Sequence, residues 1–254
     1  MRKFTCSLII VLVLLIPSCL QAASGTDPNG VLGLKWGDSP QVVKSKLESQ
    51  NIKFMQKSPS EKQNSYASGE LYVYEGHVLG VKSQNTIKVK FLKNALYEVN
   101  FYFNSSNEFP QKKLKEALFD IQNAIYGKYG EPIEIWNLHL GDSKDLEKRD
   151  TLHRQYLLSE EDYLSERNTT QSDPKLFNEL SKYFNGVYEK RKRWLIGNTG
   201  IMFGNDTQVG GQEISEILLI SGLQLRYYSN KGLEERKKAL LSFQEQQRMQ
   251  NDQK

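Results

Sequence analysis

The sequence has almost no cysteine. Its two cysteines, Cys6 and Cys19, both lie within the first 22 residues. A chain that loses this segment has no thiol, which excludes a disulfide, a thiolate nucleophile and a thiolate zinc site. We therefore expect the remaining residues, about 230 of them, to be held together by their hydrophobic core alone.

Long apolar runs are also scarce, because only the N-terminus carries one. Arg2 and Lys3 precede the run Leu8–Ile16, which Pro17-Ser18 breaks before the small residues Ala22, Ala23 and Ser24. The run is shorter than the roughly 20 apolar residues that a membrane-spanning helix needs. It predicts a secretory signal peptide over residues 1–22 and an exported mature chain with no transmembrane span.

The end of this signal peptide allows two kinds of processing. Leu20-Gln21-Ala22 fits ordinary cleavage, which would give a periplasmic protein. Ile16-Pro17-Ser18-Cys19 is similar to the bacterial lipoprotein box, in which the cysteine is acylated, although Pro17 departs from the usual residue. We expect a periplasmic protein, with attachment to the outer membrane through Cys19 as the alternative.

Neither charge nor motifs indicate a cofactor. The chain has 34 basic and 30 acidic residues, too even a balance to predict nucleic-acid binding. Glycine-rich phosphate loops are absent. Of His77, His139 and His153, none has a second histidine three to five residues away, so no metal site is expected. Asp142 and Asp145, near His139, are expected to face solvent.

Residues 30–132 predict a first unit of helices and sheet. Ser39 and Pro40 are typical of a helix start, and Val43 and Leu47 mark the buried stripe of that helix. A second helix is expected after Pro110, with an apolar stripe at Leu114, Leu118, Ile121 and Ile125.

Strands are expected between these two helices. Residues 71–74, 87–91 and 96–103 are rich in aromatic and β-branched side chains. Turns are expected at Glu75-Gly76 and at Lys93-Asn94. Apolar and charged residues alternate strictly over 87–91, so one face should be buried and the other should be wet.

Residues 133–243 repeat this order loosely. They predict a strand at 133–136, a charged insertion over 140–174 with some helix, a helix on Leu176, Leu180 and Phe184, strands at 194–196, 201–203, 217–220 and 223–228, and a last helix from near Leu233. Residues 244–254 read as a polar tail. The fold class predicted is α+β, an antiparallel sheet with helices packed on one face, and the two loosely repeated units raise the hypothesis of a duplication.

Several short phrases carry a resemblance. The sequence from Gly33 to Pro40 resembles the Gly-x-x-Trp-Gly-x-Ser opening of small uncharacterised exported proteins of Gram-negative bacteria. Leu96–Val99, Tyr126–Pro132 and Leu223–Tyr228 are similar to later strands and to the helix end of those proteins. The resemblance implies an α+β envelope domain with no assigned activity.

A hydrolase is the alternative function, and Ser39 and His153 are its one candidate pair of residues. Gly37-Asp38-Ser39 and Asp150–His153 resemble blocks of Gly-Asp-Ser esterases, but Gly204–Asp206, which resembles their Asn block, follows the His block instead of preceding it. That family also needs parallel strands. Ser39 has a sufficient role as a helix cap, so no catalytic residue is assigned.

The basic run Lys190-Arg191-Lys192-Arg193 is the strongest charge feature of the chain. On a strand it would split, with the two lysines on one face and the two arginines on the other. Outside the cytoplasm it would meet anionic lipid or an acidic protein, or it is a solvated strand end. The sequence therefore favours a non-enzymatic binding or structural module whose partner is an envelope protein or a membrane surface.

Overall fold

The computed structural model describes residues 28–58, 69–103, 111–139, 142–158, 184–210 and 218–252. The predicted signal peptide and Cys19 lie outside these residues. The helices are α1 (Pro40–Glu48), α3 (Gln111–Tyr129), α4 (Ser143–Tyr156) and α7 (Asn230–Asn251). None of these four helices is long and apolar enough to cross a membrane.

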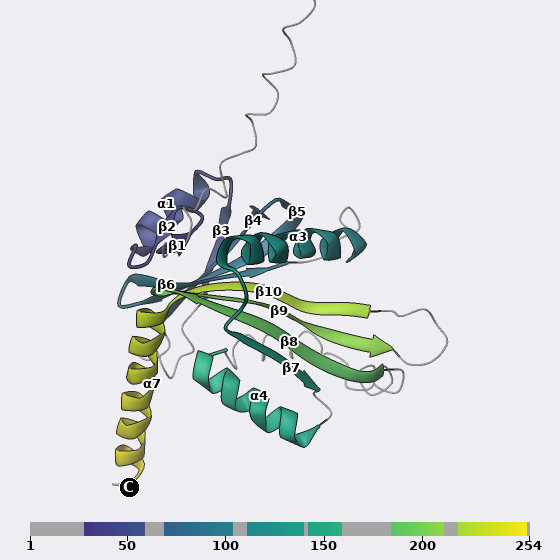
Figure 1. The fold of residues 1–254 in the computed structure, drawn as a ribbon. Helices are drawn as coiled ribbons and strands as arrows, with labels where there is room; N and C mark the ends of the chain where they lie inside the picture. The colour runs from purple at the N-terminus through teal and green to yellow at the C-terminus, as the bar shows by residue number, and fades with distance from the viewer. Residues whose placement is uncertain are drawn as a thin grey trace, which may run out of the picture.

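One antiparallel sheet dominates the fold (Figure 1), in the order β3-β4-β5-β6-β10-β9-β8-β7. Its strands are β3 (Lys53–Ser58), β4 (Glu70–Val78), β5 (Val81–Leu92), β6 (Ala95–Tyr102), β7 (Glu134–His139), β8 (Phe184–Ile196), β9 (Thr199–Gly210) and β10 (Leu218–Ser229). A small hairpin, β1 (Gly30–Val31) and β2 (Leu34–Lys35), precedes α1. The α+β class with an antiparallel sheet is confirmed.

The first helix forms as its sequence predicts. Ser39 is the N-cap of α1 and its side chain accepts a hydrogen bond from the Val42 amide, while Pro40 begins the helix. Val43 and Leu47 are fully buried. All of these signals are local, so they do not depend on the rest of the chain.

Helices cover both faces of the sheet. Helices α1 and α3 lie on one face, here called the α3 face, over a core that includes Val43, Leu47, Val99, Phe101, Ile125, Trp194 and Leu225. The expectation of helices on one face holds for these two. Helix α4 packs on the opposite face, the α4 face, because Trp136 and Leu138 are apolar residues of β7 that point there with Leu152 and Tyr156 of α4.

The two predicted units join in one sheet. Residues 30–132 supply β3 to β6, and residues 133–243 supply β7 to β10. The seam is the antiparallel pair of β6 and β10, with Phe101 opposite Leu225 and Val99 opposite Tyr227. Helices α3 and α4 lie on different faces, so the visible repetition is confined to the strands and the duplication stays a hypothesis.

One expected turn is wrong. Glu75-Gly76 lies within β4, and the chain reverses at Leu79-Gly80 instead. The glycine serves packing, since a Cβ on Gly76 would lie 3.0 Å from Ile52 Cγ1. The turn at Lys93-Asn94 is confirmed, with φ angles of 50° and 63°.

The second half also departs from expectation at three places. Two separate strands are predicted at 217–220 and 223–228, but residues 218–220 and 223–228 belong to the single strand β10, which has an irregularity between Ser221 and Gln224. Phe184 begins β8, so it does not belong to a helix, and the other two residues of that predicted helix, Leu176 and Leu180, lie outside the described residues. Helix α7 continues through residues 244–251, because the glutamine, glutamate, arginine and methionine side chains of this segment favour a helix.

Candidate functional site

Strand β8 carries the basic run, and the run divides between the two faces of the sheet. Lys190 is exposed, and Lys192 Nζ donates to Gln122 Oε1 of α3 at 2.9 Å. Arg191 is buried, and Arg193 contacts residues of the α4 core. Of the four cations, only the two lysines lie where an outside partner could reach them.

Arg193 connects several elements on the α4 face. Its Nε donates to the Tyr228 hydroxyl at 2.8 Å, its Nη1 lies 3.6 Å from Glu134 Oε2, and its guanidinium stands over the Tyr156 ring at 4.7 Å. Burial lowers the pKa of Arg193, but the hydrogen bond to Tyr228 and the charge of Glu134 raise it by more. This arginine therefore links β7, β8, β10 and α4.

A second buried charge cluster lies at the seam between β6 and β10. Glu98 is 1% exposed, and its carboxylate accepts from Lys90 Nζ at 3.0 Å, from Asn100 Nδ2 at 2.8 Å and from Arg226 Nη2. Arg226 Nη1 also donates to the Tyr156 carbonyl at 2.6 Å. The expectation of a wet face on β5 is wrong at Lys90, which is only 6% exposed because it pairs with Glu98.

Two glycines in β9 make room for these side chains. A Cβ on Gly200 would overlap the ring of Tyr228, and a Cβ on Gly204 would lie 2.6 Å from Arg191 Cδ. Large side chains of β8 and β10 therefore lie flat over the strand between them. This packing indicates that the arginines of the α4 face serve the fold.

An exposed apolar surface lies at the β7 end of the sheet. Phe119 is 62% exposed, Ile133 59% and Ile135 61%. We call these three residues, with Lys190 and Lys192, the β7 edge surface. Large apolar side chains gathered next to cations on a sheet edge are typical of interaction sites.

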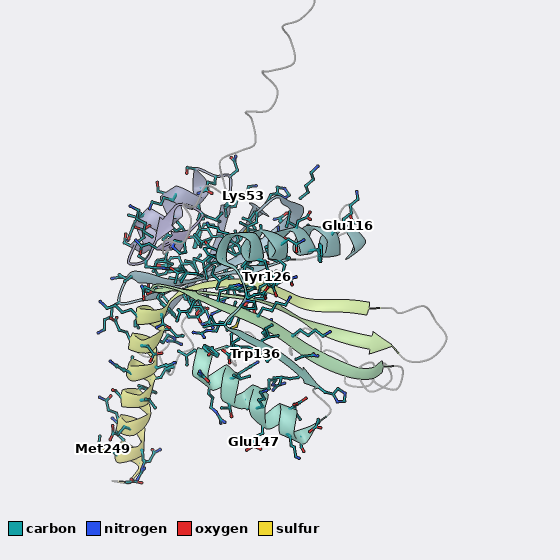
Figure 2. The ribbon with its side chains drawn as sticks, viewed as in Figure 1. Lys53, Glu116, Tyr126, Trp136, Glu147 and Met249 are labelled. Atoms are coloured by element: carbon teal, nitrogen blue, oxygen red, sulfur yellow. The ribbon has the colours of Figure 1, made fainter. Side chains whose placement is uncertain are left out.

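Register and helix geometry bring these residues to one face. Ile135 lies opposite Lys192 in the β7–β8 pairing, and Lys192 reaches Gln122 on α3. Phe119 precedes Gln122 by one helical turn and so lies on the same flank of α3. Figure 2 shows Tyr126 of α3 on this side of the sheet and Trp136 on the side of α4.

The Ser39 and His153 pair is not brought together. Ser39 caps α1, whose buried residues belong to the core of the α3 face. His153 lies on α4, whose neighbouring Leu152 belongs to the core of the opposite face. The sheet therefore separates the hydroxyl from the imidazole.

The acids near His139 shape the start of α4. Asp142 is the N-cap and accepts from the Lys144 amide at 2.8 Å, and Asp145 accepts from the His139 amide at 2.8 Å. Over the described ranges, no three His, Cys, Asp or Glu side chains gather in a way that would hold a metal ion.

The apolar members of the β7 edge surface were missed from the sequence. Phe119 lies off the apolar stripe of α3, which is a readable signal of exposure. Ile133 and Ile135 lie in or next to the strand predicted at 133–136, and only the strand order shows that β7 is an edge. Comparison of the chain with models of protein families, with curated proteins and with solved structures finds no match.

Proposed function

We propose that this chain is an exported, non-enzymatic binding module that docks a protein partner on the β7 edge surface. One observation carries the proposal: Phe119, Ile133 and Ile135 are each about three-fifths exposed, and Lys192, which lies opposite Ile135, reaches the flank of α3 that carries Phe119. Burying a large apolar side chain contributes about 1.5–3 kcal/mol, so three of them supply the core of a modest interface.

The two lysines add positive charge to this surface. Lys190 and Lys192 lie beside the apolar residues on the α3 face, whereas Arg191 and Arg193 are committed to contacts on the α4 face. The basic run thus contributes two cations to a partner, and the partner that suits them carries acidic groups next to apolar ones.

The compartment proposed for this activity is the periplasm. The support is the signal peptide predicted over residues 1–22 together with the Gly-x-x-Trp-Gly-x-Ser resemblance. Mass spectrometry of the mature N-terminus tests it: a chain that begins at Ala23 agrees with the proposal. A chain that begins at an acylated Cys19 would replace it with anchoring to the membrane.

Loss of the apolar side chains tests the docking surface. The double variant Ile133→Ser/Ile135→Ser should capture its partner from an envelope extract at least about tenfold less than the wild type, because each 1.4 kcal/mol is a factor of ten. Leu241→Ser on α7 removes an equally exposed apolar side chain elsewhere and should leave capture unchanged.

Circular dichroism before capture establishes that both variants are folded, which the exposure of all three side chains leads us to expect. Equal capture of the same protein by the wild type and by the folded double variant would contradict the proposal. No observation favours the hydrolase, because Ser39 and His153 lie on opposite faces of the sheet.

A further inference from the structure

Resting on the proposed function, we infer the kind of partner: an extended segment that pairs with the outer edge of β7 as an added strand. On the α3 face this segment would present an apolar residue and an acidic residue separated by one position. Four observations about β7 and its neighbours carry the inference.

Strand β7 ends the sheet. It pairs with β8, and its outer side pairs with no other described strand. Trp136 and Leu138 point into the α4 core, whereas Ile135 and Asn137 are exposed. The buried residues thus hold β7 in place, and within the described part of the chain no strand covers its outer edge, as strand addition requires.

The two edges of the sheet differ in how strongly their residues discourage pairing with another chain. The opposite edge, β3, carries Lys53 and Lys57, and lysine on an edge strand discourages pairing with another chain. Strand β7 has no lysine or arginine between Glu134 and His139. Open pairing is therefore favoured at β7 and disfavoured at β3.

The register defines the partner's side chains. An added strand keeps the alternation of the sheet, so its residues on the α3 face lie next to Ile135 and Asn137. A residue beside Ile135 packs against that exposed apolar side chain. A residue beside Asn137 lies one strand beyond Lys190, about 10 Å away across the sheet, which a lysine and an acidic side chain span together.

The length of the added strand is limited at one end. The backbone N–H of His139 already donates to Asp145 at 2.8 Å. The edge open to a partner therefore ends near Leu138, and the paired segment is short. A short segment with a two-residue recognition pattern matches a linear motif better than a folded domain.

Selection from a random decapeptide display library on the full mature chain tests this inference. The enriched peptides should share an apolar and an acidic residue separated by one position. On Lys190→Glu, the acidic preference should change to a basic one. Enrichment of no such pattern on the wild type would overturn the inference.

Two N-methylated forms of a selected peptide then separate backbone pairing from side-chain contact. Methylation of alternate amides blocks the set that faces β7 in one form and the outward set in the other. One form should lose affinity at least about tenfold and the other should keep it, because hydrogen bonds join β7 to one set only.

Equal binding of both methylated forms and the parent would overturn strand addition and leave the proposed surface standing. If Ile133→Ser/Ile135→Ser binds the peptides as the wild type does, the surface itself fails, and the proposed function fails with it.

Discussion

Glu98 holds the two halves of the sheet together at a single carboxylate. It accepts from Lys90 in the first half and from Arg226 in the second, and all three residues are buried. Such a cluster is costly to desolvate, so its net contribution to stability is small, but loss of one member leaves charges without a partner.

Glu98→Gln should therefore lower the free energy of unfolding by about 3–5 kcal/mol, measured by urea denaturation at neutral pH. Glu70→Gln is the matched control, because Glu70 pairs with the exposed Lys57 at 2.6 Å, and it should cost less than about 1 kcal/mol. Equal losses in the two variants would contradict a structural role for the cluster.

The buried Tyr74 should make the free energy of unfolding depend on pH in alkaline solution. Burial raises the pKa of Tyr74 to about 12 in the folded chain, from an ordinary value of 10.0. Between these values the unfolded chain loses a proton that the folded chain keeps, so the free energy of unfolding falls as the pH rises. Burial likewise raises the pKa of Tyr97 and of Tyr156 to about 12.

Tyr74→Phe should remove this residue's share of the fall, about 1.4 kcal/mol per pH unit, in urea denaturation between pH 10 and 12. At pH 8 the variant should be at least as stable as the wild type, because the buried Tyr74 hydroxyl has no hydrogen-bond partner in the structure as described. An unchanged slope above pH 10 would show that Tyr74 titrates normally.

Local signals at single residues could be read from the sequence, but contacts across strands could not. The sequence predicts the roles of Ser39 and Pro40 correctly because a helix cap depends on its immediate neighbours. It predicts a solvent-exposed Lys90 because the partner of this lysine depends on strand register. An irregularity between Lys90 and Phe91 shifts the β5–β6 pairing and brings Lys90 opposite Glu98, and nothing in the sequence announces that shift.

At the scale of elements, two glycines show where the fold has room for a larger side chain and where it does not. Gly127 lies inside α3, and a Cβ there would meet nothing within 4 Å. A Cβ on Gly200 of β9 would overlap the Tyr228 ring, whose hydroxyl accepts from Arg193. The same substitution should therefore have opposite effects at the two sites.

Gly127→Ala should raise the free energy of unfolding by about 0.5–1 kcal/mol, because alanine favours a helix more than glycine does. Gly200→Ala should lower it by about 1–3 kcal/mol through overpacking. Thermal and urea denaturation of the two variants measure both effects. A gain in stability at Gly200 would show that the Tyr228 ring does not lie over β9.

Elements were predicted well where hydrophobic periodicity is strong. Helix α3 and strand β5 follow their apolar patterns, and the tight turn at Lys93-Asn94 was found. The sequence predicts a turn at Gly76 because glycine is typical of turns, although here the missing Cβ makes room for Ile52. The sequence predicts a polar tail at the end of α7 because this segment has no apolar stripe, although its composition favours a helix.

At the scale of the whole molecule, the order of the strands decides what is exposed. The sequence predicts the class of the fold, but the pairing of β6 with β10 and the edge position of β7 arise from contacts between distant segments. The sequence predicts a strand at 133–136, but only the strand order shows that this strand is an edge and that Ile133 and Ile135 are exposed. The interaction surface proposed here is therefore a property of topology.

Photo-cross-linking in cells tests this surface most directly. A photoreactive amino acid replaces Ile135 in one strain and Glu147 in another, since Glu147 is an exposed residue of α4 on the opposite face. We predict a discrete cross-linked protein band from position 135 and none from position 147. The same band from both positions, or a band from position 147 alone, would contradict docking at the β7 edge surface.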